Sequence, residues 1–386
     1  MEKRKKKFDV KNVLTISFAH LIHDTYSAFL APILPLLIEQ LGISLFLAGI
    51  LDVSRKIPTL LNPLLGIIAD RTSVRYFVII APALTTISMS LLGLSPNYII
   101  LLVLVLVAGL ASALFHIPSP GMIKYFSFNQ LGKGMSFYML GGELARTLGP
   151  LVILGAVSLW GLNGTYKLIP FGLVASLILF FKLRKVQLEK KISEHYDHGI
   201  KQTFFMMLPL FISLAGIIFF RAAMKSALTI FLPTYLTNKG LSIWTAGISL
   251  SILQFSGAIG TYFAGSLSDK IGRKKVLLSA AIINPLLMWL FVNARGIFVL
   301  PLLIVSGFFL FTTGPVMLAL VHDVDSKHSS FINGIYMTIS FVFGSLMTLL
   351  IGVAADRFGM NLTYTLAAYV SAGAIPFVIF IKIKNK

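Results

Sequence analysis

The chain has 386 residues, of which 56% are hydrophobic and 12% are charged, and its formal net charge at pH 7 is +19. A chain this apolar cannot bury its hydrophobic surface in one soluble core, so the composition excludes an ordinary soluble globular domain. The absence of cysteine excludes disulfide bonds and thiol chemistry.

Long apolar stretches recur along the chain at the length needed to cross a bilayer, about 20 residues each. Backbone polar groups in lipid must pair within their own segment, so each stretch is predicted to be a helix. The first stretch is too long for a signal-peptide core and lacks a small-residue cleavage site, so we expect it to be retained. The sequence predicts an all-α membrane protein with twelve transmembrane helices, near residues 13–40, 45–69, 77–95, 97–124, 131–157, 165–184, 204–236, 244–267, 276–292, 297–321, 329–353 and 361–381.

One long polar stretch interrupts the apolar pattern in the middle of the chain. Residues 185–203 mix Lys, Glu, His, Asp and Gly. We interpret this stretch as a cytoplasmic linker. It predicts an N-terminal six-helix half over residues 1–184 and a C-terminal six-helix half over residues 204–386.

The basic residues are distributed unevenly between the predicted loops. If both termini are cytoplasmic, the inner loops and tails hold 24 of the 33 Lys and Arg residues, and the outer loops hold four. The positive-inside rule therefore predicts a multi-pass protein of the cell (inner) membrane with cytoplasmic termini. The basic run Lys3-Arg4-Lys5-Lys6-Lys7 is explained by contact with anionic lipid headgroups, and we expect no nucleic-acid partner.

Two similar boxes lie about half a chain apart. The first reads Gly66-Ile-Ile-Ala-Asp70-Arg71, and the second reads Gly265-Ser-Leu-Ser-Asp269-Lys270-Ile-Gly272-Arg273. Upstream of them, Leu34-Pro35 followed by Gly42-Ile43-Ser44 recurs 198 residues later as Leu232-Pro233 followed by Gly240-Leu241-Ser242. An apolar chain built from two similar halves is typical of a transporter made of repeated helical bundles.

The second box resembles the loop motif of the major facilitator superfamily. The resemblance implies two six-helix halves that rock around a midplane cavity, in a protein that works as a monomer. It also implies cytoplasmic latches that are made in one access state and broken in the other, with Asp269 just before a helix, where the helix dipole favours a carboxylate. The latch residues are Gly66, Asp70 and Arg71 in the first copy and Gly265, Asp269 and Arg273 in the second.

Further motifs are similar to the fosmidomycin-resistance type of efflux transporter within that superfamily. This branch implies proton-driven export of small, often anionic or amphiphilic compounds. His23, Glu143 and Arg146 depart from the pattern of the branch where the substrate is expected, so the substrate itself does not transfer. The similar segments are Ala19-His20-Leu-Ile-His23-Asp24, Phe115-His116-Ile-Pro118, Gly141-Gly142 with Leu148-Gly149-Pro150, and Gly352-Val-Ala-Ala-Asp356-Arg357-Phe-Gly359.

Three ionisable residues lie together deep within the first predicted helix. A charge in the middle of a bilayer costs at least about 2.5–3.5 kcal/mol, so it is normally paired or functional. His20 is one helical turn from Asp24 on the same face, His23 is adjacent, and histidine titrates near neutral pH. We predict that Asp24, His20 and His23 form the proton-coupling site. A hydrogen-bonded structural cluster and a metal site are the alternatives, and the metal site requires at least one further ligand.

Basic residues outnumber acids within the predicted spans. Arg221 and Lys225 share one helix face without a nearby acid in sequence, and Arg221 lies 198 residues after His23. We predict an anionic or zwitterionic substrate held by these two residues, because a guanidinium donates two parallel hydrogen bonds to a carboxylate or phosphate. Glu143 and Arg146 are also expected to pair locally, three residues apart on one helix. The further candidate substrate contacts are Arg146, Arg55, His116, Glu143, Tyr26 and Gln254.

Together these patterns predict a proton-coupled secondary active transporter that exports a small anionic or amphiphilic compound by alternating access. Its expected partners are protons, membrane lipids and the small molecule, and no cofactor is expected. The sequence contains no Gly-x-x-x-x-Gly-Lys-Ser/Thr loop, which argues against ATP as the driving force.

Other functions remain as alternatives at this point. A lysolipid or lipid transporter and a divalent-metal exporter are possible on the same fold. A membrane enzyme would leave the two loop latches unexplained, and a non-transporting sensor would tolerate replacement of both Asp70 and Asp269. We therefore expect a transporter and not an enzyme.

Overall fold

The computed structural model describes residues 8–61, 75–128, 131–184, 200–322 and 329–381. Every regular element in these ranges is a helix, which confirms the predicted all-α class. Eleven of the helical segments are long and apolar enough to cross a membrane. The remaining predicted span, 45–69, is described as α3 (Leu45–Lys56) and η1 (Ile57–Leu61), and its continuation lies outside the described residues.

The chain divides into two compact units. One unit holds residues 1–43 and 54–193, and the other holds residues 44–53 and 194–386. Residues 200–203 of the stretch predicted to be a linker belong to α10 (Ile200–Thr229). The first part of α3 packs with the second unit, although its sequence belongs to the first half.

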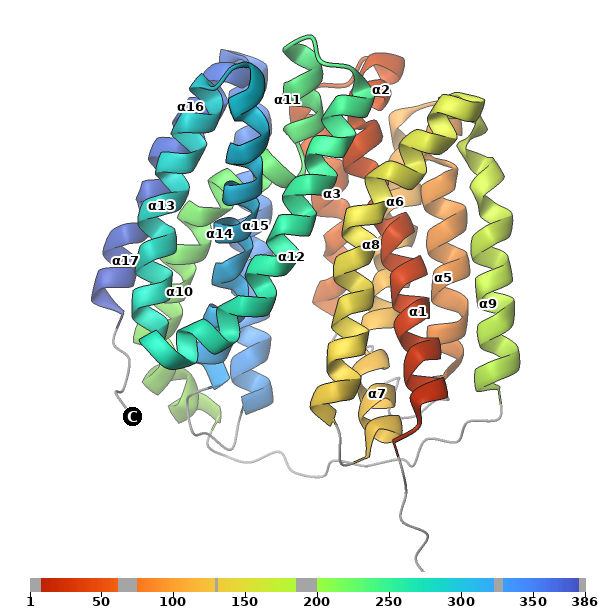
Figure 1. The fold of residues 1–386 in the computed structure, drawn as a ribbon, viewed down its shortest axis with the longest axis horizontal. Helices are drawn as coiled ribbons and strands as arrows, with labels where there is room; N and C mark the ends of the chain where they lie inside the picture. Colours follow the sequence, from red (N-terminus) through yellow and green to blue (C-terminus); the bar gives the residue numbers. More distant parts are fainter. Residues whose placement is uncertain (1–7, 62–74, 129–130, 185–199, 323–328, 382–386) are drawn as a thin grey trace, which may run out of the picture. The chain divides into compact units, whose positions relative to one another are not determined.

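The first unit is organised around α1, which runs alongside α8, while α5 packs against α6 and α9 (Figure 1). Its core is apolar, with Ile16, Val78 and Phe115 fully buried. Its elements besides η1 are α1 (Val10–Ser27), α2 (Leu30–Leu41), α5 (Arg75–Ser90), η2 (Leu92–Leu94), α6 (Tyr98–His116), α7 (Ser119–Ser127), α8 (Leu131–Trp160), η3 (Leu162–Leu168) and α9 (Ile169–Leu183).

In the second unit, α12 packs against α14, α10 packs against α15, and α13 packs against α14 and α16. Its core includes Leu214, Val316 and Ile332, all fully buried. Its elements besides α10 and the start of α3 are α11 (Leu232–Asn238), α12 (Ile243–Ile271), α13 (Arg273–Asn293), η4 (Gly296–Phe298), α14 (Val299–His322), α15 (Ser329–Phe358), α16 (Met360–Ala372) and α17 (Ala374–Phe380).

The repeated Gly-x-Ser segment has the same structural role in both halves of the sequence. Gly42 ends α2 with φ of +61°, and Gly240 follows α11 with φ of +86°. Glycine takes these left-handed angles without a Cβ clash. Ser44 and Ser242 then each accept a hydrogen bond from the amide three residues on, at 3.2 and 3.1 Å, and so cap α3 and α12. The repeat therefore encodes a helix stop followed by a helix start.

A carboxylate from a distant part of the sequence also caps α3. Asp356 lies near the end of α15, and its two oxygens accept hydrogen bonds from the amides of Leu45 and Phe46, both at 2.8 Å. The first amides of a helix have no partner within the helix, and the helix dipole favours a negative charge beside them. This contact holds the start of α3 to the second unit.

Replacing Asp356 with alanine removes both acceptors from the start of α3. Loss of a helix cap typically costs about 1 kcal/mol, so we expect Asp356→Ala to lower the thermal unfolding midpoint in detergent. Glu39→Ala is the control, because Glu39 is an exposed carboxylate near the C-terminal end of α2. Equal midpoints for the two variants and the wild type would show that the cap adds no stability.

Candidate functional site

The first helix presents an acid and a histidine on one face. His20 and Asp24 are four residues apart in α1, which places them one turn apart on the same side. The Nε2 atom of His20 lies 3.2 Å from Oδ2 of Asp24, and the two side chains are only 6% and 14% exposed. The structure thus brings together two of the three residues predicted for proton coupling.

A second histidine reaches the same carboxylate from another helix. His116 is the last residue of α6, and its Nε2 atom lies 3.1 Å from Oδ1 of Asp24. Each carboxylate oxygen therefore has its own imidazole. The sequence predicts a substrate contact for His116, whereas the structure places it in the acid–histidine cluster. Its side chain is 37% exposed, which makes it the most accessible of the three.

Tyr138 of α8 is hydrogen-bonded to the imidazoles of both His20 and His116. Its backbone carbonyl accepts a hydrogen bond from Nδ1 of His20 at 2.8 Å, and its hydroxyl lies 3.2 Å from Nδ1 of His116. The tyrosine ring also stacks on the His20 ring, with 4.1 Å between the ring centroids. The sequence does not indicate this role of Tyr138, because a backbone carbonyl is common to every residue and leaves no mark in the sequence.

Gly142 makes the contact between α1 and α8 possible. A Cβ at this position would lie 2.6 Å from the His20 ring, closer than real Cβ contacts come. Gly142 is four residues after Tyr138, and side chains on a helix tilt toward its N-terminus. The absence of a side chain at Gly142 therefore leaves the Tyr138 carbonyl accessible to Nδ1 of His20. The Gly141-Gly142 pair, noted in the sequence as part of a resemblance, has this direct structural use.

His23 lies at the edge of the cluster. Its Nε2 atom is 4.0 Å from Oδ1 of Asp24, beyond hydrogen-bond distance. Its Nδ1 atom lies 3.0 Å from the hydroxyl of Thr85, and its ring stacks on Phe115 at 4.7 Å. His23 is fully buried. We therefore assign it a packing role beside the acid–histidine cluster.

The hydrogen bonds around His20 require one more proton than its neutral form supplies. A backbone carbonyl can only accept, so Nδ1 of His20 carries the hydrogen that it donates to Tyr138. A neutral imidazole has only one N–H, which leaves a lone pair on Nε2 facing the Asp24 carboxylate. The contact becomes favourable when a proton lies in it, either on Nε2 or on the carboxyl group. The contacts of His116 require no additional proton, because its Nδ1 can accept a hydrogen bond from the Tyr138 hydroxyl while its Nε2–H donates to Asp24.

The same three side chains also have the atom types of a metal site. Ligand atoms of His20, Asp24 and His116 lie within 4.8 Å of one another, the one such group in the described part of the chain. A closed structural zinc site needs four protein ligands. A proton satisfies the observed contacts without any further group, so the geometry favours a proton over a metal ion.

The other predicted residues of the first unit lie apart from this cluster. Arg146 and Glu143 form the expected local ion pair, at 2.8 Å. Arg55 donates a hydrogen bond to the carbonyl of Ser27 at 3.4 Å. The hydroxyl of Tyr26 donates to a backbone carbonyl in η3 at 2.7 Å, and the side chain is buried, so we assign it a structural role.

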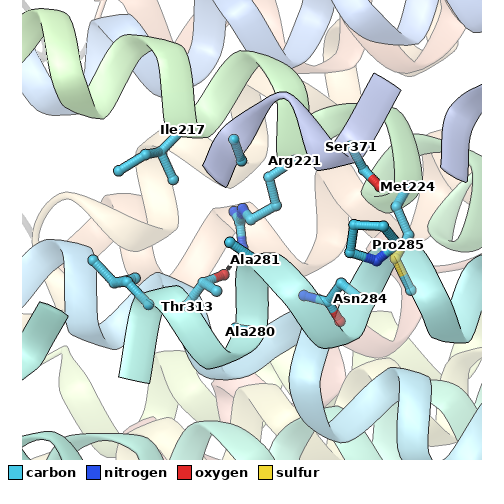
Figure 2. A pocket seen from close by; sticks show the side chains of 11 residues that line it. Ile217, Arg221, Met224, Ala280, Ala281, Asn284, Pro285, Thr313 and Ser371 are labelled. Atoms are coloured by element: carbon cyan, nitrogen blue, oxygen red, sulfur yellow. Dashed lines mark hydrogen bonds between the residues drawn. The ribbon is translucent and has the colours of Figure 1, made fainter. Parts of the chain in front are cut away.

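In the second unit, Arg221 lines a small pocket together with Met224, Asn284, Thr313 and Ser371 (Figure 2). One terminal nitrogen of its guanidinium donates to the carbonyl of Leu310 at 3.2 Å and to the hydroxyl of Thr313. Its Nε–H group is buried and has no hydrogen-bond partner. No acidic side chain of the described residues forms an ion pair with this guanidinium.

The remaining substrate candidates of the second unit do not line this pocket. Lys225 is exposed on α10 one turn after Arg221, and Gln254 is half-buried on α12. Asn284 and Thr313 are pocket residues that sequence analysis missed. Single polar residues in apolar spans are usually contacts between helices, so only the placement of Asn284 beside Arg221 distinguishes it.

The second latch copy spans the end of α12 and the start of α13. Asp269 pairs with Arg273 at 2.6 Å, and Arg273 also donates to the hydroxyl of Ser268. The sequence predicts Asp269 in a loop just before a helix, whereas it lies in the last turn of α12, because that helix runs on past Gly265 to Ile271. The first latch copy, with Gly66, Asp70 and Arg71, lies outside the described residues.

Comparisons with known proteins agree on one family. The model of the Major Facilitator Superfamily matches residues 16–348 and 214–385. The fosmidomycin resistance protein of Escherichia coli (strain K12) is 24% identical, over 92% of this chain and 88% of its own length. The multi-drug resistance efflux pump PmrA of Streptococcus pneumoniae serotype 4 is 25% identical, over 72% of each chain.

A solved structure supports the same fold. A bacterial homolog of the human lysosomal transporter Spinster, in an inward-facing and unoccupied conformation, superposes with a TM-score of 0.78. The superposition covers 98% of this chain and 96% of the other, at 14% sequence identity. At that identity the likeness concerns the fold alone.

Gly142→Ala tests whether the glycine positions His20. The added methyl group would overlap the imidazole, so the ring must move away from Asp24 and the Tyr138 carbonyl. We expect folding to cost about 1–3 kcal/mol and proton movement across the membrane, followed in proteoliposomes, to fall to the background of empty vesicles. Gly155→Ala is the matched control on α8, because a Cβ there meets nothing within 4 Å. Proton movement at the wild-type rate in folded Gly142→Ala would contradict this role.

Proposed function

The chain belongs to the Major Facilitator Superfamily, and on that premise we propose that it is a proton-coupled exporter of a small anionic or zwitterionic compound. The superfamily consists of membrane transporters and not of enzymes, so the chain is a multi-pass secondary transporter that works on a small molecule. The single observation that supports coupling to protons is the His20–Asp24 contact, which is favourable only with a proton in it.

The charge on the cluster changes when this proton leaves. With the proton bound, the positive imidazolium and the negative carboxylate cancel. Without it, the cluster carries one net negative charge and a lone pair of His20 faces the carboxylate. Enclosing a net charge within a membrane is costly. We propose that the proton-free transporter changes its access only when a bound substrate offsets this charge, as the ammonium group of a zwitterion would, which gives exchange of one for the other.

Export is the direction that the relatives favour. One relative is named a fosmidomycin resistance protein and another a multi-drug resistance efflux pump. In addition, the Gly149-Pro150 pair in α8 resembles the helix-kinking signature of exporters in this superfamily. We infer an exporter of the same kind, with a substrate of its own.

The charge of Arg221 supports an anionic group on the substrate. Among the residues that the structure describes, this guanidinium is held by neutral oxygens, and its Nε–H has no hydrogen-bond partner. A buried cation without a counter-ion is costly in a membrane, and an oxyanion removes that cost through two charge-assisted hydrogen bonds. Lys225 and Arg146 remain secondary contacts in this proposal.

The proposed orientation rests on charge. The predicted inner loops and tails are much richer in Lys and Arg than the outer loops, so we propose that both termini face the cytoplasm of a cell with this protein in its inner membrane. In that orientation the Asp269–Arg273 pair lies at the cytoplasmic surface, where a latch between access states belongs.

One observation favours a second candidate function. The close approach of His20, Asp24 and His116 would suit a divalent metal as cargo if the substrate itself supplied the missing ligands. The proton remains the better explanation because it completes the existing contacts unaided. Asp24 takes part in both the proton-coupled exporter and the metal exporter, so the experiment must distinguish them by which compound stimulates proton flux.

The test is dissipation of an imposed pH gradient in proteoliposomes, for wild type and Asp24→Asn. The amide keeps the size of the side chain but cannot take up a proton. We expect one class of small anions or zwitterions to accelerate dissipation in wild type, and the acceleration to fall to the background of empty vesicles in Asp24→Asn.

Glu39→Gln is the control, an exposed acid-to-amide change in the same unit. A folded Asp24→Asn protein that keeps substrate-stimulated proton flux would contradict the coupling site. Stimulation by divalent metals alone would favour the metal exporter, and stimulation by lysolipids alone would favour a lipid transporter.

A further inference from the structure

We propose that the Arg221 pocket of the second unit binds a small oxyanion group that also carries a hydroxyl, and that Asn284 selects for the hydroxyl. The inference rests on the proposed function, because it names the substrate class of that exporter. It adds a selectivity residue on α13 to the cation predicted on α10.

The first half of the site is the unused donor of Arg221. Its Nε–H is buried without a partner in a pocket that it shares with Asn284. The guanidinium is fixed by the Leu310 carbonyl and the Thr313 hydroxyl on α14, so the direction of Nε–H is set. A fixed, charged donor facing a pocket is suited to an anionic oxygen.

The second half of the site is an unused acceptor. Asn284 is 4% exposed, and its Oδ1 atom has no hydrogen-bond partner. Its Nδ2 atom points to the carbonyl of Phe309 at 3.5 Å, and this contact fixes the amide orientation because the reverse would set two acceptors against each other. Asn284 therefore brings an unpaired carbonyl oxygen to the lining of the pocket.

A proline adds a second acceptor to the same wall. Pro285 lies inside α13 and has no N–H to give to the carbonyl four residues earlier. That carbonyl belongs to Ala281, which also lines the pocket (Figure 2). Residues of α13 thus bring acceptors to the lining of this pocket, and Arg221 of α10 brings the cationic donor.

These groups define the chemistry of the ligand. A water molecule could bridge them but would leave the charge of Arg221 without a counter-ion. An anion with acceptors only would satisfy Arg221 but would face the Asn284 oxygen with a lone pair. An oxyanion with one ionised and one protonated oxygen satisfies both sides. The pocket has room for about one water molecule as it stands, so its walls must part to admit the head group, and the rest of the compound stays outside.

Two isosteric probes separate these cases. Methylphosphonate at mildly acidic pH and methanesulfonate have nearly the same shape and the same single negative charge, but only the phosphonate carries a hydroxyl. We expect the purified full-length protein to bind methylphosphonate about tenfold or more tightly than methanesulfonate, by calorimetry or by ligand-dependent thermal stabilisation. A site built to hydrogen-bond a hydroxyl rejects analogues that lack it.

Two variants test which residues produce the preference for methylphosphonate over methanesulfonate. Asn284→Leu removes the acceptor and should abolish the preference while methanesulfonate still binds, whereas Arg221→Gln should weaken both probes. Asn293→Leu is the matched control, because Asn293 is an exposed residue on the same helix outside the pocket. Equal binding of the two probes by wild type would overturn the selectivity, and this measurement requires no variant. Binding of neither probe would overturn the site.

These outcomes are distinct from failure of the proposed function. If the probes do not discriminate but other compounds still drive Asp24-dependent proton flux, the pocket proposal fails and the exporter stands. If the probes discriminate but no compound drives proton flux, the site stands and the exporter fails.

Discussion

The hydrogen bond from His20 to the Tyr138 carbonyl is the contact on which the proposed proton site depends. A free imidazole beside a carboxylate would turn its single N–H toward the acid and stay neutral. Here Nδ1 is engaged at 2.8 Å and the ring is stacked between neighbours, so Nε2 faces Asp24 without a hydrogen of its own. The close approach of α1 and α8 at Gly142 makes that arrangement possible. The packing of α1 against α8 thus makes the His20–Asp24 contact favourable only with an additional proton.

The two units treat buried charge in different ways. In the first, Asp24 has histidines on both oxygens, and Glu143 has Arg146, so charge is balanced locally. In the second, Arg221 is half-buried against neutral oxygens, and its buried Nε–H is left without a partner. Balanced charge suits a group that must exchange a proton reversibly. A charge without a counter-ion suits a ligand-binding group, because a membrane environment raises the free energy of the ligand-free state.

Features that depend on local spacing could be predicted from the sequence. The His20–Asp24 pair follows from a four-residue interval on a helix, and the Glu143–Arg146 pair from a three-residue interval. These two inferences needed only the periodicity of one helix. The repeat around Gly42 and Gly240 was also visible in the sequence, but its role in ending and starting helices, with positive φ angles and serine caps, came from the structure.

Features that depend on distant contacts could not be predicted. His116 meets Asp24 across 92 residues, and Asp356 caps α3 across more than 300, so no spacing rule connects them. The Tyr138 carbonyl and the orientation of the Asn284 amide carry no sequence signal at all. Asp269 was placed in a loop because Gly265 suggested the end of a span, whereas glycine is tolerated within helices packed in membranes.

The protonation state of His20 is the most direct measure of this mechanism. Nitrogen-15 NMR of the histidine side chains in the reconstituted transporter, with His20→Gln to assign the signal, reports which ring nitrogens carry hydrogen. At neutral pH and without substrate, we expect hydrogen on Nδ1 and a second proton shared between Nε2 and Asp24. A neutral ring with its only hydrogen on Nε2 would contradict the proposed proton site.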